Sequence, residues 1–216
     1  MRWVVWSVVG IAVGLRAGLT ARSRIVDLRK SGEVFGEAHV AHHALTVPIM
    51  ALLGGAILAL ASLRFAGDMT VAAHVVFVGA CLHLSLVDID THLLPRRTTY
   101  GALLLGLFLL FVAAVVDHEG SFTWSLLGAL IMWMVLTVLG VLSRGDLGGG
   151  DIALGLLLGA FLAFDTPWDI ASALVLGFLA AGVFAMGLLV MRRANRRTRF
   201  PFGPFLIAGA LVLVLR

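Results

Sequence analysis

The chain has 216 residues, of which 61% are hydrophobic and 13% are charged, and its mean hydropathy is +1.06. Globular proteins are about half apolar and a quarter charged, so this composition excludes a soluble globular domain. It also excludes intrinsic disorder, which requires low hydrophobicity. The formal net charge of +4 is no indication of a nucleic-acid partner in so apolar a chain, and Cys81, the only cysteine, rules out a CxxC pair. The sequence predicts an integral membrane protein.

Apolar runs that are long enough, or nearly long enough, to cross a bilayer recur along the whole chain. A hydrocarbon core about 30 Å thick requires roughly 17–25 apolar residues in a helix. Uninterrupted runs of Leu, Ala, Val and Gly lack the alternation of a membrane β-barrel, so these segments are predicted to be helices. The predicted fold is an all-α, polytopic membrane bundle of about eight transmembrane helices, at residues 3–20, 44–66, 70–87, 99–116, 124–142, 152–164, 169–191 and 200–215.

The basic residues predict the orientation of this bundle, because Arg and Lys concentrate on the cytoplasmic side of membrane proteins. Arg2, Arg64 and Arg216 fall on one side of the predicted helices. The other thirteen basic residues fall on the opposite side, which we therefore expect to face the cytoplasm, with both termini outside. These thirteen are Arg16, Arg22, Arg24, Arg29, Lys30, Arg96, Arg97, Arg144, Arg192, Arg193, Arg196, Arg197 and Arg199. The longest polar connection, about 21–43, is too short for an independent core.

Four of the twelve acidic residues form two clusters on the predicted cytoplasmic side. Asp88 and Asp90 end the third span, and Asp146 and Asp151 flank the glycines at 148–150 before the sixth. Burying a carboxylate in a membrane helix is costly, so acids at helix boundaries point to function. Glycines before an acid allow a tight backbone and leave amides free to bind a substrate carbonyl. Two close carboxylates share one proton, so the pair can act as base and acid in peptide hydrolysis.

Three segments resemble motifs of the type IV prepilin peptidases, in the order that this family has them. Residues Val87–Pro95 (VDIDTHLLP) are similar to the family's first aspartate motif, and Gly148–Asp151 (GGGD) matches its GxGD motif. Residues Phe200–Leu206 (FPFGPFL) resemble its C-terminal segment, which opens the last helix. The interval of 63 residues between Asp88 and Asp151 is typical of the family. The resemblance covers about 44–216, which we expect to form the peptidase domain, whereas 1–43 match only loosely.

The resemblance implies an aspartic endopeptidase that cuts the basic leader from prepilins or pseudopilins. Asp88 and Asp151 would be the catalytic pair, one acting as general base and the other as general acid. The enzyme would lie in the bacterial cytoplasmic membrane with its site facing the cytoplasm, and its partners would be the substrate and the lipid bilayer. Residues expected to bind substrate or shape the site are Asp90, Pro95, Gly148, Gly150, Pro201, Gly203 and Pro204.

The sequence also departs from the family pattern. Long members carry a cytoplasmic domain with paired CxxC motifs and methylate the new pilin N-terminus. Because this chain has no CxxC, we expect no methyltransferase activity, no zinc and no other cofactor. Arg96 and Arg97 follow Pro95 where the family often has Asp. Two alternatives remain open: an ion- or proton-coupled transporter using Asp88 and Asp151, and a catalytically silent homologue in a secretion system.

Overall fold

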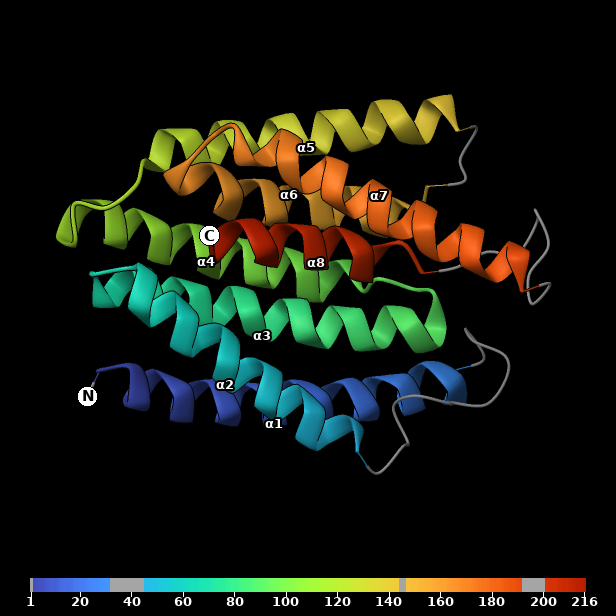
Figure 1. Ribbon diagram of the computed structural model, residues 1–216, viewed down its shortest axis with the longest axis horizontal. Helices are drawn as coiled ribbons and strands as arrows, with labels where there is room; N and C mark the ends of the chain where they lie inside the picture. The colour runs from blue at the N-terminus through green and yellow to red at the C-terminus, as the bar shows by residue number, and fades with distance from the viewer. Residues whose placement is uncertain (1, 32–44, 144–146, 192–200) are drawn as a thin grey trace.

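Eight helices run side by side along one direction in the computed structural model (Figure 1). The structure describes residues 2–31, 45–143, 147–191 and 201–216, and no strand occurs within these ranges. Six of the helices are long and apolar enough to cross a membrane, whereas α6 and α8 have 17 and 12 residues. The predicted all-helical membrane bundle is confirmed. The helices are α1 (Arg2–Lys30), α2 (Thr46–Arg64), α3 (Asp68–Thr91), α4 (Arg96–Val116), α5 (Phe122–Leu142), α6 (Gly149–Asp165), α7 (Asp169–Val190) and α8 (Gly203–Val214).

The first helix is longer than the hydropathy of the sequence predicts. We expected a span over 3–20 followed by a polar connection, but α1 continues to Lys30. Ala21, Ile25 and Leu28 recur at helical spacing and are buried in a small cluster with Leu86 and Val87 of α3. Burial of this apolar face stabilises the additional turns of α1. The charged residues between the buried positions lower the average hydropathy of the segment, so hydropathy alone does not predict these turns. The rest of the predicted connection, 32–44, lies outside the described residues.

Glycine pairs allow two pairs of helices to touch through their backbones. A Cβ on Gly10 of α1 would collide with the carbonyl oxygen of Gly54 in α2, and the reverse substitution would collide with Gly10. Gly128 of α5 and Gly159 of α6 face each other in the same way. Small residues favour close association of helices in lipid, where the hydrophobic effect does not drive them together. These glycines therefore serve helix packing.

The core of the bundle lies around α3, α6 and α8. The rings of Phe77 in α3 and Phe161 in α6 stack with their centroids 4.4 Å apart, and the buried His74 ring stacks on Phe65 at the same distance. The short helix α8 packs against α3, α6 and α7 (Figure 1). This packing brings the C-terminal end of α3 and the N-terminal ends of α6 and α8 to one end of the bundle, which we call the site end.

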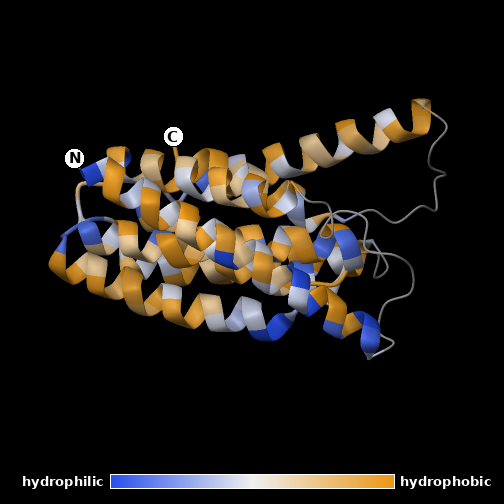
Figure 2. Ribbon diagram, turned by 90° about the horizontal axis from the view of Figure 1, so that it is seen from below, coloured by the Kyte–Doolittle hydropathy of each residue, from blue (hydrophilic) through white to orange (hydrophobic). Residues whose placement is uncertain are grey.

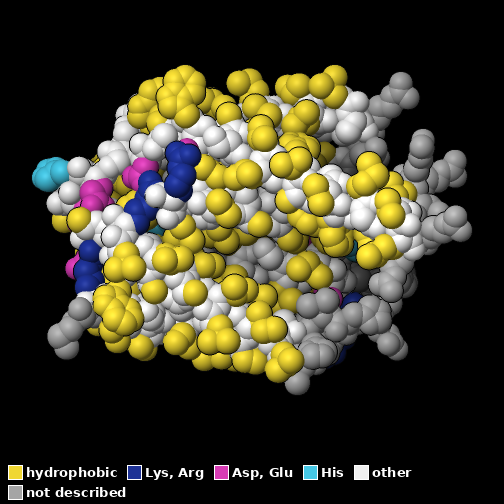
Figure 3. All heavy atoms as spheres, in the orientation of Figure 1, with side chains coloured by type: hydrophobic (Ala, Val, Ile, Leu, Met, Phe, Trp, Pro, Cys, Tyr) yellow, Lys and Arg dark blue, Asp and Glu magenta, His cyan; other side chains and the backbone are white. Residues whose placement is uncertain are grey.

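The ion pairs of the described residues lie at the opposite end, which we call the ion-paired end. Its three ion pairs are Arg2–Asp68, Arg64–Asp165 and Arg216–Asp169. Figure 3 shows these charges clustered at one end, whereas hydrophobic side chains cover most of the rest of that face. In Figure 2 orange hydrophobic positions dominate the length of the helices, and the last turns of α7 lean away from the bundle. The apolar middle with polar ends fits a chain that spans a bilayer.

Candidate active site

Asp88 lies in the last turn of α3 with only 4% of its surface exposed. The backbone N–H of Gly203, the first residue of α8, donates a hydrogen bond of 3.1 Å to its Oδ2. The helix ends just after it, because His92 adopts a left-handed conformation (φ 52°) and its N–H donates to the Asp88 carbonyl at 2.8 Å. Asp88 is therefore held by the last turn of α3 and by the N-terminus of α8.

Asp151 lies in the first turn of α6 and is half-buried. Gly148 is the N-cap of this helix, and a Cβ on Gly148 would lie 3.2 Å from Asp151 Oδ2, so the carboxylate reaches back towards the cap. The dipole at a helix N-terminus favours a negative charge there. Its other oxygen, Oδ1, is buried and has no hydrogen-bond partner among the described residues. One carboxylate oxygen in the first turn of α6 is thus buried and unsatisfied.

Asp88 and Asp151, 63 residues apart in the sequence, lie at the same end of the bundle, where Leu94 contacts both Gly203, the hydrogen-bond partner of Asp88, and Gly150, the residue before Asp151. Within the described part of the chain, neither of them forms an ion pair. Two neighbouring acids that are not ion-paired repel each other when both are charged, so they favour a state that shares one proton. Such a pair can take a proton from water and give one to a leaving group.

Two residues that the sequence analysis did not single out contact the GGGD segment. Leu94 packs against Gly150, where a Cβ would lie 2.6 Å from the Leu94 Cβ. The guanidinium of Arg96 lies so close to Gly149 that a Cβ there would collide with its Nη2. Leu94 belongs to the motif Val87–Pro95, and its place in this first aspartate motif was a usable signal. For Arg96 the sequence offered only its departure from the family pattern.

The other predicted site residues lie at the same end of the bundle but differ in their contacts. Gly203 bonds Asp88 directly, and Pro204 follows it in the first turn of α8, where its missing N–H is no loss. Pro95 is the N-cap of α4. Asp90 is half-buried in the last turn of α3, about 200° around the helix from Asp88, and Pro201 is half-buried before α8. Asp146 lies outside the described residues.

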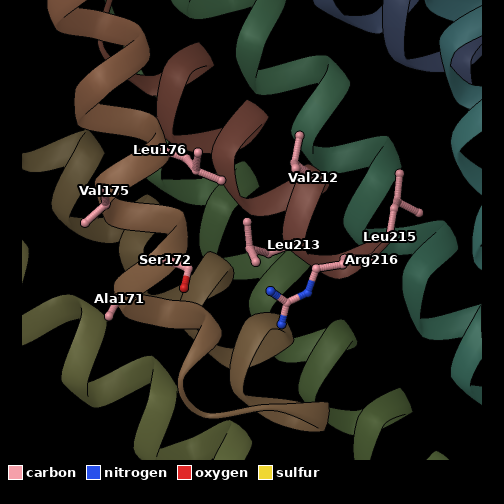
Figure 4. A pocket seen from close by; sticks show the side chains of 8 residues that line it. All are labelled: Ala171, Ser172, Val175, Leu176, Val212, Leu213, Leu215 and Arg216. Atoms are coloured by element: carbon pink, nitrogen blue, oxygen red, sulfur yellow. The ribbon is translucent and has the colours of Figure 1, made fainter.

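Neither a metal cluster of described residues nor the groove at the other end of the bundle competes with this site. Where the structure describes side chains, no three His, Cys, Asp or Glu residues are grouped as a metal site requires. A groove of about 660 Å³ lies between the first turns of α7 and the end of α8, lined by Leu176, Leu213 and Arg216 among others (Figure 4). It belongs to the ion-paired end, because Arg216 there pairs with Asp169. The aspartate pair is therefore the candidate site.

The sequence is similar to known proteins over most of its length. A Bacillus subtilis (strain 168) protein named prepilin leader peptidase/N-methyltransferase is 28% identical over 170 residues, which are 78% of this chain and 65% of that protein. A Burkholderia pseudomallei (strain 1026b) protein of the same name is 31% identical over 166 residues, 75% of this chain and 52% of the relative. This chain thus spans about half to two thirds of the length of these relatives.

The comparison with solved structures finds no match. The sequence model of the type IV leader peptidase family, by contrast, matches residues 75–191, which are more than half of the chain. The matched range contains Asp88 in α3, Asp151 in α6 and the Leu94 turn between them. The chain therefore belongs to the type IV leader peptidase family.

Proposed function

We propose that this protein is an aspartic endopeptidase that removes the leader peptide from type IV prepilins or pseudopilins. The observation that carries the proposal is the buried pair Asp88 and Asp151, drawn together at one end of a membrane bundle by the ends of α3, α6 and α8. Family membership supports the same activity, because the relatives are named prepilin leader peptidases. We take 44–216 as the peptidase domain, with α1 supporting the last turns of α3.

The chemistry that we propose uses one carboxylate as base and the other as acid. The charged member of the pair removes a proton from a water molecule while that water attacks the scissile carbonyl carbon. The protonated member stabilises the carbonyl oxygen and then supplies a proton to the leaving amine as the C–N bond breaks. The products are the free leader carboxylate and a new amino terminus, and no covalent intermediate forms. The backbone amides around Gly148–Gly150 are suited to hold the substrate carbonyl.

We further propose that the site end faces the cytoplasm of a bacterial cell and that the ion-paired end faces outward. Arg29 and Lys30 end α1, and Arg96 and Arg97 begin α4, so the described basic residues favour this orientation. A prepilin inserted in the cytoplasmic membrane keeps its leader on that side. Its scissile bond would then meet the carboxylates at the boundary between lipid and cytosol.

The relatives' name also includes an N-methyltransferase, and we propose that the residues of this chain do not perform that second reaction. The proposal rests on the single cysteine, since a CxxC zinc pair cannot form within these 216 residues. The test is mass analysis of the processed product after incubation with and without a methyl donor. A product heavier by one methyl group only when the donor is present would contradict this part of the proposal.

The main experiment incubates the purified protein, in detergent or lipid, with a prepilin-like peptide and sequences the new N-terminus. We expect one defined cut, lost in Asp88→Asn and in Asp151→Asn. Asp165→Asn is the matched control, because this aspartate pairs with Arg64 at the ion-paired end, and we expect it to cleave normally. Cleavage by both site variants would refute the mechanism. Proton or cation flux in liposomes without any cleavage would favour a transporter instead.

A further inference from the structure

The turn between α3 and α4 reaches all three segments that build the site. Leu94 is its central apolar residue, half-buried and packed against the main core of the bundle. A Cβ on Gly150 would lie 2.6 Å from the Leu94 Cβ and 3.1 Å from its carbonyl oxygen. A Cβ on Gly203 would lie 3.2 Å from Leu94 Cδ1. Leu94 therefore lies against the first turns of both α6 and α8.

These two first turns are the ones that hold the carboxylates. Gly203 donates its backbone N–H to Asp88, and Gly150 directly precedes Asp151. Both positions lack a side chain, so the Leu94 side chain fills the space beside them. A change in the volume at position 94 would let the two helix ends shift relative to each other, because packed interiors leave little free space.

The backbone of the turn is itself tied to α3. The His92 N–H donates to the Asp88 carbonyl at 2.8 Å, and the Thr91 hydroxyl donates to the Val87 carbonyl at 2.7 Å. The N–H of Leu93 donates to the Thr91 hydroxyl at 3.3 Å. The position of Leu94 is thus fixed relative to Asp88 on one side, while its side chain abuts the helix that carries Asp151 on the other.

We propose that Leu94 is a positioning residue that sets the separation of the Asp88 and Asp151 carboxylates. The inference rests on the proposed peptidase function and adds to it a residue that does not touch the reacting atoms. Two carboxylates that work through one water molecule tolerate little displacement, and a misplacement of about 1 Å can cost on the order of 100-fold in rate. Leu94 would therefore govern the rate of cleavage rather than the binding of the prepilin.

The test compares Leu94→Ala with Leu93→Ala, because the neighbouring Leu93 is 40% exposed and has the same side chain. We expect Leu94→Ala to lower kcat by roughly 10- to 100-fold with little change in KM. We also expect the two limbs of its pH–rate profile to shift, since the coupling of the two acids depends on their separation. Leu93→Ala should stay within about twofold of the unmodified protein. Leu94→Met, which conserves volume, should recover most of the rate.

A purely structural role for Leu94 would lower the thermal unfolding midpoint without moving the pH profile of the folded fraction, and that result would overturn the inference. Equal effects of Leu93→Ala and Leu94→Ala would overturn it too. If Leu94→Ala does not accumulate in the membrane, Leu94→Val, which removes one methylene, applies the same test. Failure of the unmodified protein to cleave would refute the proposed function. Normal cleavage by Leu94→Ala would refute this inference alone.

Discussion

The two ends of the bundle differ in whether their carboxylates are paired with arginines. At the ion-paired end Asp68, Asp165 and Asp169 each lie within 3.2 Å of an arginine nitrogen. At the same end, Glu119 Oε1 accepts from the backbone N–H groups of Ala66 and Gly67, both at 2.9 Å. At the site end Asp88 and Asp151 form no ion pair with any described residue, and Asp88 accepts the backbone N–H of Gly203.

This difference separates acids that stabilise the fold through ion pairs from the two acids that we propose as the catalytic pair. An arginine beside an acid favours the charged form of that acid, so an ion-paired acid contributes to stability and holds no proton to give. Two acids that share a site lower the free energy of unfolding. Proteins keep such unfavourable arrangements mainly at functional sites. Whether an aspartate of this protein contributes to stability therefore depends on whether an arginine lies beside it.

Apart from the loss of cleavage in the aspartate variants, the largest effect that we expect comes from a methyl group at the site end. In Gly203→Ala the new Cβ would lie 2.8 Å from Asp88 Oδ2 and would displace this carboxylate. We expect prepilin cleavage to fall by roughly 10- to 100-fold. The matched control is Gly101→Ala in α4, where nothing lies within 4 Å of the new Cβ. Rates are measured with the purified protein, and equal rates for the two variants would show that Gly203 does not position Asp88.

Replacing aspartate by asparagine should change the free energy of unfolding by an intermediate amount, with opposite signs at the two ends. Asp151→Asn removes one of two neighbouring acids that repel each other when both are charged, so we expect the free energy of unfolding to rise by about 1 kcal/mol while cleavage is lost. Asp169→Asn removes the buried partner of Arg216, so we expect a decrease of about 1 kcal/mol with cleavage unchanged. Unfolding in detergent measures both values. A decrease in both variants would contradict the distinction between the two ends.

The smallest effect should come from the half-exposed pair Arg64–Asp165, which is 3.2 Å long. A double-mutant cycle with Arg64→Ala and Asp165→Ala should give a coupling free energy of about 0.2–1 kcal/mol. This coupling should weaken as salt is added, because the pair lies near the aqueous boundary. Cleavage should stay constant throughout the cycle, and a loss of cleavage in either single variant would link this end to the site.

The sequence predicted the fold class and the approximate positions of the helices, and it singled out the two aspartates of the candidate site. Long apolar runs are a strong signal because each must cross about 30 Å of hydrocarbon, and Asp88 and Asp151 stood out because acids are rare at such positions. The end of α1 was predicted wrongly. Average hydropathy does not register the buried face of Ala21, Ile25 and Leu28, whose contacts come from α3.

The sequence predicted neither the positioning role that we propose for Leu94 nor the acceptor of the Gly203 backbone N–H. Leu94 is one apolar residue among many in this chain, and its importance comes from the two glycines against which it packs. The hydrogen bond from Gly203 to Asp88 joins residues 115 positions apart and uses a backbone amide, which every residue except proline possesses. The identity of a residue therefore does not predict such a contact.

The sequence by itself determined that this chain forms a helical membrane bundle with a few acids at helix boundaries, because hydrophobic length and the cost of burying charge act locally along the chain. Only the tertiary structure decided which acids would pair with arginines, and that Asp88 and Asp151 would lie at the same end of the bundle without such a pair among the described residues. That choice depends on how α3, α6 and α8 pack, and packing joins residues that the sequence holds far apart.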